Sequence, residues 1–135
     1  MDQDKTESTG ELTKILYVED EESIRGVVKE FFQTIGYDVT SAEEGNEALK
    51  YFNQNKDDSL ASKFALVITD INMPNGMGGI ELIKEIHKSD QKIPIIAISG
   101  YLKNSDYIKD LPSDVSYFQK PVRLKELAQK IKEIL

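Results

Sequence analysis

Short apolar runs alternate with amphipathic stretches along most of the chain. Five of these runs are rich in β-branched and aromatic residues and predict strands, at residues 14–20, 37–42, 64–69, 93–99 and 115–119. The third run, FALVIT, contains no charged residue and ends at Asp70. Such a run is typical of a strand that is covered on both faces of a sheet.

Between the runs, apolar residues recur every three or four positions and predict five helices, over residues 24–35, 46–53, 80–86, 104–111 and 124–135. Gly36 ends the first helix, and Pro112 ends the fourth. Glu21 and Glu22 are expected to cap the first helix. Strands that alternate with helices predict an α/β domain, in which a parallel sheet carries helices on both faces.

The chain of 135 residues has the length of one domain. Residues 1–11 are polar and lack apolar periodicity, so we expect a disordered leader followed by one domain over residues 12–135. The net charge of −7 argues against a protein that binds nucleic acid directly. No apolar run could cross a bilayer and no secretion signal opens the chain, which predicts a cytoplasmic protein without membrane insertion.

Two residue types limit the possible chemistry. The chain contains no cysteine, which excludes a disulfide scaffold, a thiolate zinc site and a cysteine nucleophile. It contains one histidine, His87, which lies among charged residues and is expected to be solvated. A site built from several histidines, or from a serine and a histidine, therefore has little material.

Polar residues stand where the predicted strands end. The first strand ends at Glu19 and Asp20, the third at Asp70, the fourth at Ser99 and the fifth just before Lys120. In a parallel α/β sheet, ligands bind beyond the carboxyl ends of the strands. We therefore expect three carboxylates, a hydroxyl and an ammonium at one edge of the sheet.

Three neighbouring carboxylates repel one another unless a cation lies between them. Carboxylate oxygens suit Mg²⁺, which keeps several waters and bridges to phosphate groups. With a lysine nearby, this set predicts phosphoryl chemistry, because both cations offset charge on the transferring oxygens. Asp70 is the best candidate for a nucleophile, since it follows the most central-looking strand and precedes a sharp turn. Ser99 could hydrogen-bond a phosphoryl oxygen.

Four segments in order resemble the receiver domain of two-component response regulators: ILYVEDEE (15–22), LVITDINMP (66–74), IIAISG (95–100) and YFQKP (117–121). The resemblance runs from about residue 14 to the C-terminus. Each motif alone is weak, but four at successive strand ends are a specific signal. The resemblance implies a flavodoxin-like, doubly wound (βα)5 sandwich, whose five parallel strands lie in the order 2-1-3-4-5.

The resemblance also implies how the acids are used. Asp70 matches the phosphoacceptor. Glu19 and Asp20 match the acidic pair that holds Mg²⁺ together with Asp70, with Asp20 as the more direct ligand and Glu19 acting largely through water. Asn72 matches the position that gives the metal its main-chain carbonyl, and it also matches a position that modulates hydrolysis of the phosphoryl group.

The remaining matched residues concern switching. Ser99 matches the switch hydroxyl, Lys120 the lysine that contacts the phosphoryl group, and Tyr117 the aromatic residue that rotates inward on activation. Tyr101 matches a residue that could shade the phosphoryl group from water and slow its hydrolysis. The Lys120–Pro121 peptide resembles one that is cis in the family, which proline makes feasible.

The chain differs from the family pattern in two segments. The turn NMPNGMGG after Asp70 is one residue longer than the common form and has Gly78 where an acid is usual. This change could loosen the turn without removing a proposed ligand. The fourth predicted helix is short and polar, so the surface that meets a partner is expected to be unusual.

The sequence ends with the fifth predicted helix, so we expect a stand-alone receiver, which is a signalling switch and not an enzyme. It would take a phosphoryl group onto Asp70 from a histidine kinase or a histidine phosphotransfer protein, with Mg²⁺ required. The face of the fourth helix, fifth strand and fifth helix would then change shape and contact an unidentified downstream protein.

Three other interpretations fit the sequence less well. A flavin-binding module on the same sheet needs a phosphate loop rich in Ser, Thr and Gly after the first strand, where residues 19–22 are four acids. An aspartate-nucleophile phosphatase carries a second acid two residues after its nucleophile, where this chain has Asn72. A degenerate receiver that only binds protein is disfavoured by the intact acceptor, acidic pair and lysine.

Overall fold

The computed structural model describes residues 12–54, 63–74, 76–90, 92–100, 111–112 and 114–135. Within these ranges it contains five strands, β1 (Lys14–Val18), β2 (Asp38–Ala42), β3 (Leu66–Asp70), β4 (Ile95–Ser99) and β5 (Ser116–Gln119). It also contains four helices, α2 (Glu22–Thr34), α3 (Gly45–Gln54), α4 (Gly79–Ser89) and α5 (Leu124–Ile134). The predicted leader at 1–11 and nearly all of the predicted helix at 104–111 lie outside the described residues.

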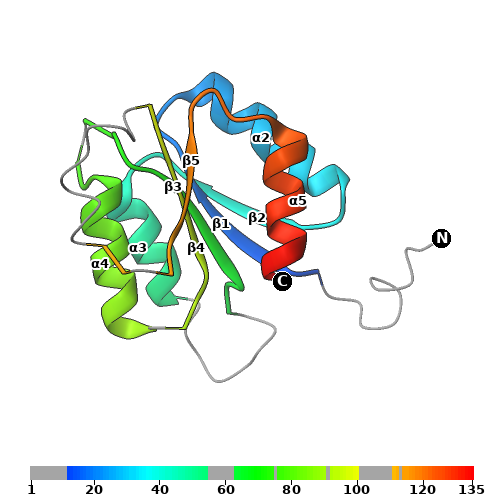
Figure 1. Cartoon of the computed structure of the whole chain (residues 1–135). Helices are drawn as coiled ribbons and strands as arrows, with labels where there is room; N and C mark the ends of the chain where they lie inside the picture. Colours follow the sequence, from blue (N-terminus) through cyan, green and yellow to red (C-terminus); the bar gives the residue numbers. More distant parts are fainter. Residues whose placement is uncertain (1–11, 55–62, 75, 91, 101–110, 113) are drawn as a thin grey trace.

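The five strands form one parallel sheet in the order β2-β1-β3-β4-β5 (Figure 1). This order confirms the predicted doubly wound α/β fold. The register aligns the carboxyl ends of the strands, since Val18 pairs with Thr69 and Ser99 pairs with Gln119. Residues just beyond these ends therefore become neighbours although they are far apart in the sequence.

Helices cover both faces of the sheet, with α3 and α4 on one side and α2 and α5 on the other (Figure 1). Successive strand residues point to opposite faces, so each central strand supplies both cores. Leu16 and Val67 pack with α3 and α4, while Tyr17 and Ile68 pack with α2 and α5. All five residues of β3 are buried, which explains its uninterrupted apolar run. No helix in the described ranges combines the length and the hydropathy of a membrane-spanning segment.

The observed bounds of all five strands differ from the predicted ones by one or two residues. β1 ends at Val18, so that Glu19 and Asp20 follow the strand and do not lie within it. β4 begins at Ile95, directly after Pro94, whose ring nitrogen has no hydrogen to donate to a neighbouring strand.

The cap predicted for the first helix is only partly correct. Glu22 lies in the first turn of α2, where its negative charge interacts favourably with the positive end of the helix dipole. Glu21 stands at the cap position, but its side chain makes no capping hydrogen bond, so that part of the prediction is wrong. The main-chain N–H of Glu21 instead donates to the carboxylate of Glu19 at 3.2 Å, which draws the start of the helix toward the end of β1.

Candidate functional site

Charged side chains from three strand ends meet at the carboxyl edge of the sheet. Glu19 follows β1, Asp70 is the last residue of β3, and Lys120 follows β5. The Nζ atom of Lys120 lies 2.8 Å from Oδ2 of Asp70 and 3.7 Å from Oε1 of Glu19. The structure thus brings together the acids and the ammonium that the sequence places at separate strand ends.

Both carboxylate oxygens of Asp70 accept hydrogen bonds. Lys120 donates to Oδ2, and the main-chain N–H of Asn72 donates to Oδ1 at 3.2 Å. Only 2% of Asp70 is exposed to solvent. The protein, more than the solvent, therefore sets the orientation of this carboxylate.

Glu19 is buried beside Asp70 and is anchored through its main chain as well as its side chain. Its carboxylate accepts from the N–H of Glu21, and its main-chain carbonyl accepts from Nη1 of Arg25 at 2.9 Å. Burial, and then the negative charge of Asp70, raise the pKa of the Glu19 carboxyl to about 7. In the metal-free protein this carboxyl therefore takes up a proton more readily than an exposed glutamate does.

Lys120 stays charged although it is partly buried. Burial alone would lower its pKa, but the hydrogen bond to Asp70, followed by the negative charges of Asp70, Glu19 and Asp20, outweighs that effect and raises the pKa above its usual value. The main-chain N–H of Lys120 donates to the carbonyl of Ser99 at 2.9 Å. The Lys120–Pro121 peptide is cis, as predicted.

The acids at this edge fit a hard divalent cation. One carboxylate oxygen from each of Glu19, Asp20 and Asp70 lies within 4.8 Å of the others. Lys120 supplies one positive charge against three carboxylates, two of which are buried, so the cluster is short of positive charge. Because all the side-chain ligands are oxygens, the donor set suits Mg²⁺ better than a soft metal.

Ser99 and Asn72 are joined by a hydrogen bond. Ser99 is fully buried, and its Oγ donates to Oδ1 of Asn72 at 2.9 Å. The main-chain N–H of Asn72 also contacts Asp70, so Asn72 links the predicted switch hydroxyl to the predicted acceptor. Both residues are predicted from the sequence, but the bond between their side chains is not.

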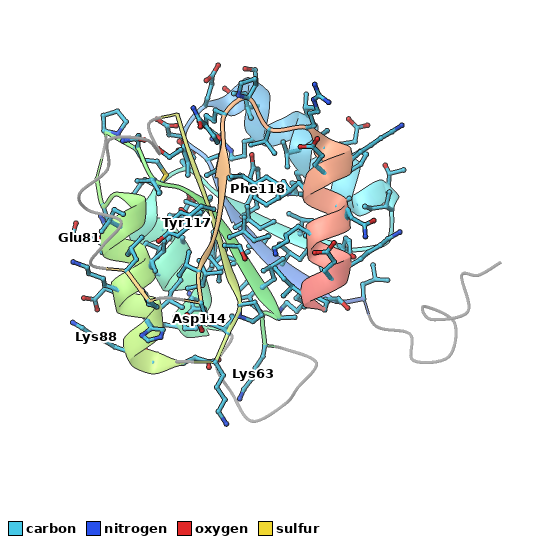
Figure 2. The ribbon with its side chains drawn as sticks, in the orientation of Figure 1. Lys63, Glu81, Lys88, Asp114, Tyr117 and Phe118 are labelled. Atoms are coloured by element: carbon cyan, nitrogen blue, oxygen red, sulfur yellow. The ribbon has the colours of Figure 1, made fainter. Side chains whose placement is uncertain are left out.

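Tyr117 lies apart from the acids, on β5. It is half-buried and packs against the core under α3 and α4, while its neighbour Phe118 packs on the opposite face with α2 and α5 (Figure 2). Burial raises the pKa of the Tyr117 phenol. Its switching role stays a prediction, because the structure describes a single conformation. Tyr101 lies outside the described residues.

The turn between β3 and α4 is tied to α3 by Glu44, a residue that sequence reasoning missed. The Glu44 carboxylate accepts hydrogen bonds from the main-chain N–H groups of Asn46, Glu47 and Met77. Met77 is 33 residues away in the chain, so no local spacing signals the contact. The sequence suggests that the extra residue could loosen the turn after Asp70. The bond from Met77 to Glu44 anchors this turn at the end that is farther from Asp70.

Known proteins share this sequence pattern and fold. The model of the family described as response regulator receiver domain matches residues 15–132. The chain is 32% identical over 126 residues to chemotaxis protein CheY1 of Helicobacter pylori, covering 90% of this chain and 96% of CheY1. The crystal structure of response regulator protein TrrA from Thermotoga maritima in complex with Mg²⁺–BeF gives a TM-score of 0.76 at 36% identity, covering 92% of this chain and 100% of TrrA.

Other relatives are much longer than this chain. It is 34% identical over 132 residues to the sensor kinase CckA of Brucella abortus, covering 96% of this chain but only 13% of the kinase. It also spans about half the length of several transcriptional regulators that it matches. Among its relatives the same domain therefore occurs both nearly alone and as one part of a larger protein.

Proposed function

Because this chain belongs to the response regulator receiver domains of two-component signalling, we propose that it accepts a phosphoryl group on Asp70 from a histidine kinase or a histidine phosphotransfer protein. The single observation that carries the proposal is the buried Asp70 carboxylate, held by Lys120 and close to Glu19 and Asp20. The relative TrrA, solved with Mg²⁺–BeF, supports a Mg²⁺-dependent reaction at these acids.

The proposed transfer is a displacement at phosphorus. An oxygen of the Asp70 carboxylate forms the new P–O bond, while the bond between phosphorus and the donor's histidine nitrogen breaks and its electron pair stays on that nitrogen. The product is an acyl phosphate on Asp70. The N–H of Asn72 orients the attacking carboxylate, and the ammonium of Lys120, 2.8 Å from it, offsets charge on the transferring oxygens.

Glu19, Asp20 and Asp70 would hold Mg²⁺, together with the main-chain carbonyl of Asn72. When bound, the ion would offset the negative charge on the phosphoryl oxygens. The protein's own part is to keep three carboxylates together in spite of their repulsion and to bury two of them away from water.

The proposed signal begins at Ser99. Its hydroxyl has one hydrogen to donate, and in this conformation it donates that hydrogen to Oδ1 of Asn72. A phosphoryl group on Asp70 is a charged and therefore stronger acceptor. Ser99 would exchange Asn72 for a phosphoryl oxygen, and Tyr117 would turn inward. The face that includes β5 and α5 would then present a changed surface to a downstream protein. The fourth helix that the sequence predicts for this face lies almost wholly outside the described residues.

We further propose that the protein is a stand-alone switch and not an enzyme that turns over a substrate. The relative CheY1, of which the chain spans 96%, supports this arrangement. The net charge of −7 supports protein partners over direct contact with nucleic acid. Action in the cytoplasm, without insertion into a membrane, is part of the same proposal.

Incubation with a small phosphodonor such as acetyl phosphate is expected to add the mass of one phosphoryl group to the protein, only when Mg²⁺ is present. Without the ion, three carboxylates repel the incoming phosphate, and among the described side chains only Lys120 forms ion pairs with them. Intact-mass measurements with Mg²⁺, and with a chelator in its place, test this expectation. A folded protein that binds Mg²⁺ but gains no mass contradicts the proposal and favours a degenerate receiver that acts by contact.

Mg²⁺ affinity is expected to be about tenfold weaker at pH 6 than at pH 8. With a pKa of about 7 in the metal-free protein, the Glu19 carboxyl is mostly protonated at pH 6 and mostly charged at pH 8. Binding of Mg²⁺ at low pH must displace this proton, so the affinity falls as the pH falls. Calorimetric titrations in two buffers with different heats of ionisation measure both the affinity and the released proton.

The Glu19→Gln variant is the control for this pH dependence. Glutamine keeps the shape of the side chain but has no proton to release, so the variant is expected to bind Mg²⁺ more weakly and with nearly the same affinity at pH 6 and pH 8. Equal affinities of the wild type at the two pH values would exclude Glu19 as the titrating group.

A further inference from the structure

The carboxylate of Glu44 joins two segments that are distant in the sequence. Its Oε1 accepts from the N–H of Asn46 at 2.7 Å and from the N–H of Met77 at 3.1 Å, and its Oε2 accepts from the N–H of Glu47 at 3.3 Å. Asn46 and Glu47 belong to the first turn of α3, whereas Met77 belongs to the turn that follows Asp70. The Glu44 side chain thus accepts hydrogen bonds from main-chain N–H groups of both α3 and the turn after Asp70.

Met77 is held by both of its main-chain groups. Besides the N–H bond to Glu44, its carbonyl accepts from the N–H of Gly45 at 2.9 Å. This close approach leaves no room for side chains at two positions. A Cβ atom on Gly45 would lie 2.7 Å from the carbonyl oxygen of Met77, and one on Gly76, where φ is +82°, would lie 2.5 Å from Oε1 of Glu44.

The near end of the same turn is fixed at the phosphorylation site. Asn72 donates its N–H to Asp70 and accepts from Ser99. The N–H of Gly79 donates to the carbonyl of Ile71 at 3.1 Å and closes the turn at its base. Asn72 is therefore held by the site, and Met77 is held by Glu44. Met77 also lies two residues before Gly79, whose bond to Ile71 connects it to the backbone next to Asn72.

We propose that Glu44 is a positioning residue of the phosphorylation site, which fixes Met77 and thereby holds the turn in the shape that keeps Asn72 against Asp70 and Ser99. The inference rests on the proposed function of Asp70 and extends it to a residue that touches neither the donor nor the acceptor. It assigns Glu44 an effect on Mg²⁺ binding and on phosphoryl transfer, because Asn72 is the proposed main-chain ligand of the ion.

Two variants and a matched control test the role of Glu44. Glu44→Ala removes every acceptor, and Glu44→Gln keeps one acceptor oxygen but replaces the second with a donor. Glu43→Gln makes the same charge change one residue earlier, at an exposed side chain whose carboxylate accepts no hydrogen bond within the described ranges. Three quantities are measured well below the melting temperature: Mg²⁺ affinity, the rate of labelling by acetyl phosphate, and the ¹H–¹⁵N amide resonance of Asn72.

Glu44→Ala is expected to reduce both the Mg²⁺ affinity and the labelling rate about tenfold, as loss of a supporting hydrogen bond around a metal site does. Glu44→Gln is expected to show a smaller reduction, and Glu43→Gln none. The Asn72 resonance should shift in Glu44→Ala and stay in place in Glu43→Gln. A lower melting temperature with unchanged affinity, rate and Asn72 resonance would mean a merely structural role and would overturn the inference.

Failure of the proposed function is distinguishable from failure of this inference. If the wild type and Glu43→Gln are labelled and the two Glu44 variants are labelled equally fast, only the positioning role of Glu44 is wrong. If the wild type itself is never labelled, the proposed function is wrong. The Asn72 resonance of Glu44→Ala then still decides whether Glu44 positions the turn, since that measurement needs neither Mg²⁺ nor phosphodonor.

Discussion

Replacement of Asp70 by asparagine is expected to reduce phosphorylation by more than about 100-fold, with acetyl phosphate and with a histidine kinase alike. The amide of asparagine occupies the same space but is a far poorer nucleophile than a carboxylate. The substitution also removes one of the three carboxylates that are proposed to hold Mg²⁺. The measurement is a time course of intact mass for the variant and the wild type at the same Mg²⁺ concentration.

The fold of the Asp70→Asn variant is expected to survive. Lys120 still lies near Glu19, and removal of the Asp70 charge takes away one cause of the raised Glu19 pKa, so the buried site becomes less repulsive. Asp38→Asn is the matched control, because Asp38 is an exposed aspartate at the start of β2, at the opposite edge of the sheet. The control should be labelled at the wild-type rate. Equal labelling of Asp70→Asn would exclude Asp70 as the acceptor.

Replacement of Lys120 by methionine is expected to slow phosphorylation about 100-fold at saturating Mg²⁺, the usual cost of removing one charged donor from a transition state. Methionine keeps much of the length of the side chain but has no ammonium. Nothing else among the described side chains approaches Oδ2 of Asp70 as Lys120 does, at 2.8 Å. Labelling rates of the variant and the wild type measure the effect.

The same variant is expected to depend more strongly on Mg²⁺ for stability. In the metal-free protein, Glu19 and Asp70 lose their only ion-pair partner within the described residues. The loss should cost about 1–3 kcal/mol, less than for a fully buried pair because Lys120 is one-third exposed. In thermal melts at pH 8, the addition of Mg²⁺ should therefore raise the melting temperature of Lys120→Met more than that of the wild type.

Lys125→Met provides the control for Lys120. Lys125 lies exposed on α5, and the substitution removes the same charge from the same domain without touching the acids. The control should keep both the labelling rate and the response of the melting temperature to Mg²⁺. Wild-type labelling by Lys120→Met would contradict the role proposed for the ammonium.

The fold could be predicted from the sequence because its signals are local. The buried run that ends at Asp70 and the helical spacing of Ile83 and Ile86 report directly on which faces are covered. The parallel arrangement then places Glu19, Asp70 and Lys120 at one edge, since the carboxyl ends of parallel strands coincide. The convergence of the charged residues is therefore predictable from the topology alone.

The contacts between side chains could not be predicted in this way. The bond from Ser99 to Asn72 and the bond from Met77 to Glu44 join residues 27 and 33 positions apart, and each depends on how a turn folds. Turns have no repeating pattern from which a side-chain direction could be read. The inward movement of Tyr117 depends on a second conformation, so it rests on the resemblance to the family and stays a prediction.

The residue that carries the phosphoryl group in the wild-type protein can be identified directly. Borohydride reduces an acyl phosphate to an alcohol, so labelled protein treated with it should carry homoserine in place of the phosphorylated aspartate. Peptide mass spectrometry of protein labelled in the presence of Mg²⁺ is expected to find this change at residue 70 and at no other position. Reduction at Glu19 or Asp20 with Asp70 intact would contradict the account.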